Sequence, residues 1–117
     1  MKELTKAEEE VMQVLWTLEK AFVKEILAEF KEPRPAYNTI STIVRILEKK
    51  GFVSFEAFGK SHRYYPLIDK ETYRESLSQS LVSKYFEGSA KNLISFFAQK
   101  EEISVEELDK ILKELKK

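Results

Sequence analysis

Apolar residues recur at steps of three and four through most of the chain, a period that predicts a largely helical protein. The first predicted helix begins at Thr5 and Glu8, which have the spacing of a capping box, and extends for about 14 residues. A second, shorter helix is predicted for residues 23–30, and the prolines within residues 33–35 are expected to end it. Two helices in close succession therefore open the chain.

The third predicted helix, residues 38–50, has two contrasting faces. One face carries the apolar stripe of a helix packed on a core, made of Ile40, Ile43, Val44 and Leu47. The opposite face is narrow and consists of hydrogen-bonding side chains rather than a general Glu/Lys surface: Asn38, Ser41, Thr42, Arg45 and Lys49. Gly51 is predicted to end this helix, because glycine readily adopts the left-handed conformation common at that position.

Residues 52–65 lose the helical period and are rich in β-forming side chains on both sides of Gly59-Lys60-Ser61. This pattern predicts a β-hairpin with a basic tip. Three helices followed by a hairpin, with a short second helix and a polar third, is the order of elements in a winged helix-turn-helix.

Three further helices are predicted beyond Asp69, and the last begins at a second capping box formed by Ser104 and Glu107. Segments of this size rarely bury large apolar side chains alone, so we expect a second copy of the chain to cover them. The residues expected at that dimer interface are Tyr73, Leu77, Leu81, Phe97, Leu108, Ile111, Leu112 and Leu115. The alternative is a monomer in which these helices fold back on the winged domain.

The predicted fold class is therefore mainly α with a small β-hairpin. A winged helix-turn-helix DNA-binding domain is expected at residues 1–68 and a helical dimerisation module at residues 69–117. No stretch approaches the roughly 18 apolar residues of a membrane helix, so no membrane insertion is expected. The N-terminus lacks the apolar core of a secretory signal, which favours a cytoplasmic location.

Charge is unevenly distributed along a chain whose formal net charge is zero. Residues 33–68 carry six basic and two acidic side chains, a local balance of +4, whereas the segments before and after are slightly negative. Positive charge confined to one segment of the chain is what contact with nucleic-acid phosphates requires. The alternative is an ordinary solvated surface.

The composition disfavours enzymatic function. The chain has no cysteine and one histidine, His62, which excludes disulfides, thiolate chemistry and multi-histidine metal sites. No activated nucleophile or acid–base pair stands at a recognisable spacing. We therefore expect a protein that is not an enzyme and holds neither a metal nor a cofactor.

Several segments together resemble the penicillinase repressor family of bacterial transcription regulators (BlaI/MecI/CopY). They are Leu4-Thr5-Lys6-Ala7-Glu8 with Val11-Met12 and Leu15-Trp16, Val23-Lys24-Glu25-Ile26, Asn38-Thr39-Ile40-Ser41-Thr42, the stretch from Arg45 to Gly51, Gly59-Lys60, Tyr64-Tyr65-Pro66-Leu67 and Phe86-Glu87-Gly88-Ser89. The resemblance implies a homodimeric repressor with an N-terminal winged helix and a C-terminal helical dimerisation module. Such a dimer would block transcription from a pseudo-palindromic operator of antibiotic-resistance or stress genes.

The resemblance also implies modes of regulation. In the β-lactam branch of the family, a membrane sensor with a zinc metallopeptidase domain triggers cleavage of the repressor at an Asn-Phe bond. The corresponding bond here is Phe96-Phe97, with phenylalanine where the family has asparagine, so this chain departs from the cleavage pattern of that branch. The copper-responsive branch uses a C-terminal cysteine motif, and the absence of cysteine excludes that mode here.

The polar face of the third helix supplies the side-chain types that contact base edges in the major groove. We expect Thr42 and Arg45 to face bases, and the wing tip to meet phosphates or the minor groove. The full set of predicted DNA-binding residues is Asn38, Thr39, Ser41, Thr42, Arg45, Lys49, Lys60, Ser61 and Arg63.

Two other functions remain open at this point. The winged helix could bind protein instead of DNA, or Phe86, Phe96 and Phe97 could line a small-molecule pocket between subunits. The polar third helix and the basic hairpin favour double-stranded DNA over a protein partner. Nothing in the sequence excludes a ligand in addition to DNA.

Overall fold

The computed structural model describes residues 3–115, which form six helices and three strands. In chain order these are α1 (Lys6–Leu18), β1 (Ala21–Phe22), α2 (Val23–Ala28), α3 (Tyr37–Lys49), β2 (Val53–Phe58), β3 (Ser61–Pro66), α4 (Lys70–Tyr85), α5 (Ala90–Gln99) and α6 (Val105–Leu115). The mainly helical fold class is confirmed. Residues 1, 2, 116 and 117, which the predicted domain limits include, lie outside the described residues.

Two compact units divide the chain, and the division falls between Ser76 and Leu77, inside α4. We call the part before the division the winged-helix unit and the part after it the C-terminal unit. Among the described residues, no helix combines the length and the apolar character needed to cross a membrane.

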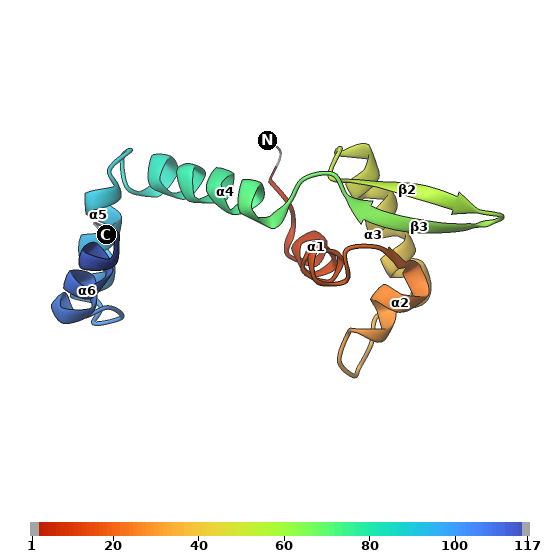
Figure 1. Cartoon of the computed structure of the whole chain (residues 1–117), viewed down its shortest axis with the longest axis horizontal. Helices are drawn as coiled ribbons and strands as arrows, with labels where there is room; N and C mark the ends of the chain where they lie inside the picture. The colour runs from red at the N-terminus through yellow and green to blue at the C-terminus, as the bar shows by residue number, and fades with distance from the viewer. Residues whose placement is uncertain (1–2, 116–117) are drawn as a thin grey trace. The chain divides into compact units, whose positions relative to one another are not determined.

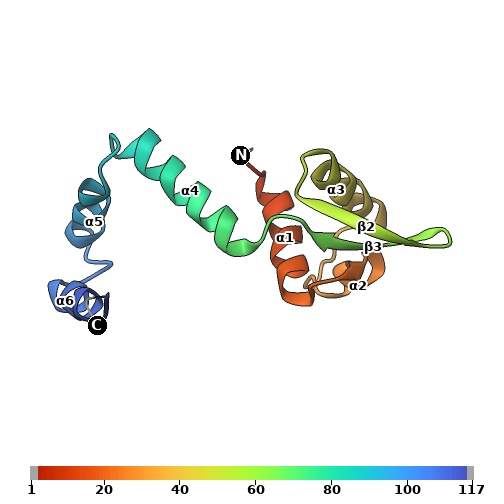
Figure 2. The same ribbon diagram turned by 45° about the horizontal axis from the view of Figure 1, so that its top comes forward.

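The predicted hairpin is present as β2 and β3, which pair antiparallel, and its tip extends past the helices of the winged-helix unit (Figures 1 and 2). Gly59 forms the tip with a φ of +62°, the left-handed region that favours glycine. The sheet has three strands rather than two, in the order β1-β3-β2. The prediction of a hairpin alone was incomplete, because a two-residue strand such as β1 leaves no period in the sequence.

The core of the winged-helix unit lies between α1, α2, α3 and the sheet. The buried apolar stripe predicted for α3 is present at Ile40, Val44 and Leu47, while Ile43 is half-buried. The largest side chains that are fully buried are Phe52, Met12, Leu15, Ile26, Ile40, Leu47, Val11, Val44 and Val53. This core fixes α3 with its polar side outward.

The ends of the helices follow their local capping chemistry. The capping box of α1 is confirmed: Glu8 N donates to Thr5 Oγ1 at 3.2 Å, and Thr5 N donates to Glu8 Oε1 at 2.9 Å. Helix α3 ends as predicted, ahead of Gly51 at φ +83°. Helix α2 ends at Ala28, earlier than predicted, so a turn beyond Ala28 and not the prolines stops it.

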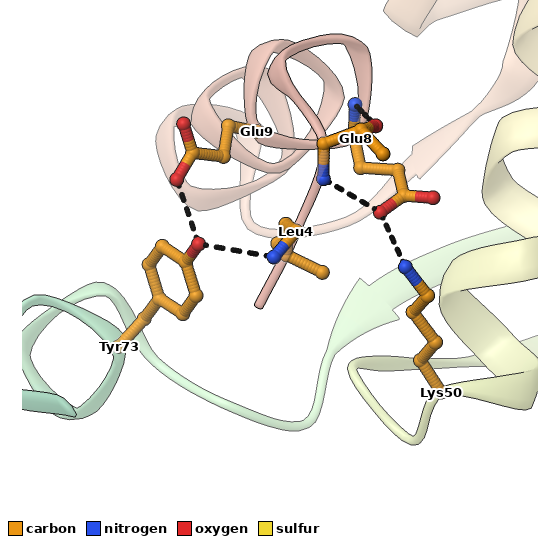
Figure 3. Close-up of polar contacts among 6 residues, drawn as sticks. Leu4, Glu8, Glu9, Lys50 and Tyr73 are labelled. Carbon is orange, nitrogen blue, oxygen red and sulfur yellow. Dashed lines mark hydrogen bonds and ion pairs between the residues drawn. The ribbon is translucent and has the colours of Figure 1, made fainter. Parts of the chain in front are cut away.

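Glu8 is also the one charged side chain buried among the described residues, with 5% of its surface exposed. Lys50 Nζ donates to Glu8 Oε1 at 2.7 Å, which joins the end of α3 to the start of α1 (Figure 3). Burial alone would raise the pKa of Glu8, but the hydrogen bonds from Lys50 and Thr5 outweigh it and lower that pKa. The buried carboxylate is therefore ionised and paired.

The first turn of α4 belongs to the winged-helix unit. Asp69 caps the helix, with its Oδ1 accepting from Thr72 N at 2.8 Å. Tyr73 is 6% exposed, and its ring lies 5.7 Å from that of Phe52 and 5.9 Å from that of Trp16. Its hydroxyl donates to Glu9 Oε2 at 2.6 Å (Figure 3).

This burial changes the interpretation of Tyr73. The side chain was predicted at the dimer interface because one copy seemed unable to bury it, yet contacts within one chain bury it almost completely. The four-residue steps linking Tyr73 to Leu77 and Leu81 gave no sign that only its own turn of α4 packs on α1. Burial and the hydrogen bond to Glu9 raise the pKa of Tyr73 to about 12.

The C-terminal unit has complete helix caps but no buried core. Ser89 caps α5, accepting from Asn92 N at 3.1 Å, and the capping box of Ser104 and Glu107 opens α6 as predicted. None of the described residues 77–115 is buried. Three phenylalanine rings do lie in contact. The ring centroids of Phe86 and Phe96 are 5.6 Å apart, and those of Phe96 and Phe97 are 5.9 Å apart.

Candidate nucleic-acid interface

A groove of about 630 Å³ lies in the winged-helix unit between α3, the start of α2 and the hairpin. We call it the wing groove. Its lining residues are Phe22, Val23, Lys24, Glu25, Tyr37, Ser41, Arg45, Phe58, Lys60, Ser61, His62 and Tyr64. It therefore contains four of the predicted DNA-binding residues, drawn from two separate segments.

Helix α3 presents its polar residues on two adjoining sides. Tyr37, Ser41 and Arg45 follow one another at four-residue steps and line the wing groove. The helical period places Asn38, Thr42 and Lys49 on the side directly opposite the buried stripe, where all three are exposed. Thr39 is exposed at the far edge of this outward side. Together these residues form a surface wide enough to contact both the base edges and the sugar–phosphate backbone of DNA.

Arg45 stands where these two sides of α3 meet. Its Nη2 donates to Ser41 Oγ at 3.2 Å, one helical turn away. Among residues 3–115 it has no ion-pair partner, so the rest of the guanidinium fork is available to a ligand. A planar fork on an exposed helix face has the geometry that contacts guanine in two places.

Two of the three contact residues predicted in the hairpin line the wing groove. They are Lys60 at the tip and Ser61 beside it. Arg63 is outside the groove lining; it is opposite Glu56 in the β2–β3 register and opposite Phe22 in the β1–β3 register. The rings of His62 and Phe55 stack with centroids 4.0 Å apart, which stiffens the wing.

The wing groove is cationic. Lys24, Arg45 and Lys60 line it against a single carboxylate, Glu25, whose Oε1 accepts from Phe22 N at 2.8 Å. Within the described residues none of these three cations forms an ion pair, in contrast to Lys20, which lies 3.0 Å from Glu56. Unpaired cations at a groove are the electrostatic feature expected of a phosphate-binding surface.

Eight of the twelve residues that line the wing groove were not among the predicted DNA-binding residues. Tyr37, Phe58, Phe22 and Lys24 all line the wing groove, and the first two are 53% and 51% exposed. Tyr37 could have been found, because it precedes Ser41 and Arg45 at the same four-residue step. The others could not, since nothing local marks which strand and helix ends the fold brings beside α3.

The predicted dimerisation residues other than Tyr73 all lie in the C-terminal unit. Leu108 is half-buried. Six are exposed, namely Leu77 (43%), Leu81 (40%), Phe97 (37%), Ile111 (45%), Leu112 (54%) and Leu115 (76%). The two residues of the candidate cleavage bond, Phe96 and Phe97, lie within α5.

A smaller hollow of about 290 Å³ in the C-terminal unit is lined by Ile94, Phe97, Glu102, Ile103 and Leu108. Of the three phenylalanines predicted to line a ligand pocket, only Phe97 is part of it. Among the described residues, no group of three or more side chains could hold a metal ion.

Comparison with known proteins identifies the family. A family model described as "Penicillinase repressor" matches residues 4–117. The chain is 29% identical to the methicillin resistance regulatory protein MecI of Mammaliicoccus sciuri over 110 residues, which cover 93% of this chain and 89% of the relative. It is 27% identical to the penicillinase repressor of Bacillus licheniformis, over 93% of this chain and 86% of the relative.

The fold has a counterpart among solved structures. The solution structure of the DNA binding domain of the repressor BlaI is similar at a TM-score of 0.53 and 31% identity, covering 62% of this chain and 94% of that domain. A winged-helix DNA-binding domain is thus matched nearly whole. The chain belongs to the penicillinase repressor family, whose members are DNA-binding transcriptional repressors rather than enzymes.

Proposed function

We propose that this repressor binds a pseudo-palindromic operator as a homodimer and thereby blocks transcription of antibiotic-resistance genes. The observation that carries the proposal is the polar side of α3 beside a groove with three unpaired cations among the described residues. The target genes are inferred from similarity, since one relative is named a methicillin resistance regulatory protein and another a penicillinase repressor.

In this proposal α3 enters the major groove with its outward side toward the bases. Arg45 contacts a guanine through its fork, and Asn38 and Thr42 contact neighbouring base edges. Lys49 near the end of α3 and Lys60 on the wing bind phosphates. Base contacts then supply the sequence preference, while phosphate contacts fix the register of the protein on the duplex.

Dimerisation is proposed for the C-terminal unit because many of its apolar side chains stay exposed and none is fully buried among the described residues. Leu112 and Leu115 of α6 are more than half exposed, as is Tyr85 at the end of α4. A second copy would bury such surfaces, at about 25 cal/mol for each Å² of apolar area removed from water. Linking two DNA-binding units also raises the effective concentration of the second one at its half-site.

Regulation by a membrane sensor with a metallopeptidase domain is the proposed means of induction. The candidate bond is Phe96-Phe97, whose side chains are 44% and 37% exposed. It lies in the middle of α5, so a protease needs that helix to open locally before it can bind the chain extended. Sequencing the N-termini of repressor fragments from induced cells would locate the bond that is cut.

The proposed function is tested by selecting binding sites from random duplex DNA with the full-length protein. We expect an enriched sequence with two inverted half-sites, and copies of it in promoters of resistance genes. Selection of a single half-site would refute the dimeric operator. Selection of no sequence would refute specific DNA recognition by α3.

A further inference from the structure

Three aromatic residues of the wing groove have no role in the proposed base and phosphate contacts. Tyr37 and Phe58 are about half exposed, at 53% and 51%, and the half-buried Phe22 lies edge-on to Phe58 with ring centroids 5.7 Å apart. All three line the same groove as Lys24, Arg45 and Lys60. The groove therefore places apolar rings among cations.

That mixture of surfaces restricts what can fill the groove. A small anion would satisfy the cations but leave the rings in water, and an apolar peptide would cover the rings but leave the cations unpaired. A sugar–phosphate strand has both properties, because charged phosphates alternate along it with the carbon skeleton of deoxyribose. Charge complementarity favours it further, since three cations face one carboxylate that is already hydrogen-bonded to Phe22 N.

We propose that the aromatic residues of the wing groove pack against the deoxyribose rings of one DNA strand, with Phe58 as the principal contact. The inference rests on the proposed binding of operator DNA and assigns a further set of contact residues to it. Phe58 ends β2 immediately before the tip residue Gly59, and the ring of Phe22 is in edge-on contact with its ring. Tyr37 lies across the groove on α3 and contacts the same strand from the other side.

The proposal makes a distinction that can be measured. Cations that bind phosphates displace counterions, so their loss reduces the dependence of affinity on salt. An aromatic ring packed on deoxyribose displaces water but no ions, so its loss should lower affinity and leave the salt dependence unchanged. Phe58 and Lys60 are two residues apart, yet only the loss of Lys60 should reduce the dependence of affinity on salt.

The experiment measures the affinity of full-length variants for the selected operator between 50 and 200 mM salt. Phe58→Ala should weaken binding roughly three- to tenfold per subunit with an unaltered salt slope, and Phe58→Leu should recover part of the loss. Leu67→Ala is the matched control, because Leu67 is 56% exposed in the same unit and outside the wing groove. It should bind like the unmodified protein.

A second measurement separates direct contact from a change in the shape of the wing. Single ribonucleotides are placed along the operator, since a 2′-hydroxyl against an aromatic ring loses its hydration without gaining a partner. A ribonucleotide at a position that contacts Phe58 should weaken binding of the unmodified protein. The same ribonucleotide should not weaken binding of Phe58→Ala. Equal weakening of both proteins at every position would overturn the proposal, even if Phe58→Ala had altered the hairpin.

The outcomes also separate this inference from the proposed function. If the unmodified protein selects no DNA sequence, the proposed function fails and the inference fails with it. If it selects an operator but Phe58→Ala binds as Leu67→Ala does, only the inference is wrong. A reduced salt slope for Phe58→Ala would likewise refute packing on deoxyribose.

Discussion

The winged-helix unit and the C-terminal unit differ in how much apolar surface each buries by itself. Every buried residue among residues 3–115 lies at or before Tyr73, whereas α5 and α6 contain none. Both units have well-formed helix caps, so local chemistry is equally satisfied in each. Good capping therefore specifies helices, but only the winged-helix unit has within one chain the partners that make a core.

This difference in burial matches the two roles that we propose for the units, DNA binding and dimerisation. The winged-helix unit uses a complete core to hold exposed polar residues of α3 and the wing in place. The C-terminal unit leaves leucines and phenylalanines exposed, and the proposed dimerisation would cover them. Changes in the two units should consequently alter DNA binding in different ways.

The largest effect is expected from charges placed in the apolar surface of α6. Leu108→Asp together with Leu112→Asp should prevent dimerisation and lower operator affinity about 10²- to 10⁴-fold, the range expected when linkage of two binding units is lost. Sedimentation and operator titration measure the two effects. Lys110→Asp on the polar side of the same helix is the control, and it should leave the dimer intact.

Core truncation should distinguish the two units by stability. Leu15 is fully buried in α1, so Leu15→Ala should lower the free energy of unfolding by about 2 to 5 kcal/mol at any protein concentration. Leu112 is 54% exposed, so Leu112→Ala should lower stability only to the extent that it weakens the dimer. Urea unfolding at two protein concentrations measures both losses of stability. If the loss caused by Leu112→Ala were as independent of protein concentration as that caused by Leu15→Ala, the account would be contradicted.

Within the winged-helix unit, Arg45→Ala should cost about 1 to 3 kcal/mol per half-site and relax the preference at one base pair. Lys60→Ala should instead weaken binding to all sequences alike and flatten the salt slope. Site selection with each variant makes the comparison. If Arg45→Ala kept its base preferences and lost affinity uniformly, Arg45 would be a phosphate contact, and Asn38, Thr42 or DNA shape would determine specificity.

The smallest effect concerns the hydroxyl that joins α4 to α1. The pKa of Tyr73 is raised to about 12 in the folded state from 10.0, so the protonated hydroxyl is favoured by folding. Its stabilising contribution is complete below pH 10 and is lost as the pH rises from 10 toward 12. Tyr73→Phe should cost about 1 kcal/mol at neutral pH and remove that part of the alkaline decline.

Thermal unfolding of the two proteins across this pH range is the measurement. Tyr85→Phe is the control, because Tyr85 is 74% exposed. An alkaline decline of the same size in Tyr73→Phe and in the unmodified protein would show that Tyr73 does not contribute to it.

Much of the winged helix could be predicted from the sequence because its signals are local. The capping box at Thr5, the two faces of α3 and the hairpin around Gly59 each depend on spacing within a few residues. Strand β1 depends instead on pairing Ala21 with Tyr64, far along the chain. No local sequence pattern predicts a strand pairing between residues so far apart in the chain.

For the candidate nucleic-acid interface too, the sequence predicted only the residues that a local pattern marks. The polar residues of α3 were identifiable because a stripe of Asn, Ser, Thr and Arg is unusual on a solvated helix. Phe58 and Phe22 were not, because an aromatic residue at a strand end is ordinarily part of a core. Only the folded chain shows that both rings line a groove beside Arg45.

The most direct test of the division between the units is the sedimentation of the full-length protein bound to one duplex that carries the selected operator. The account predicts a dimer at micromolar concentration without DNA, and two chains on each duplex bound in one step. A protein that is monomeric at that concentration and occupies the two half-sites independently would contradict it, because the apolar surface of the C-terminal unit would then not join two copies.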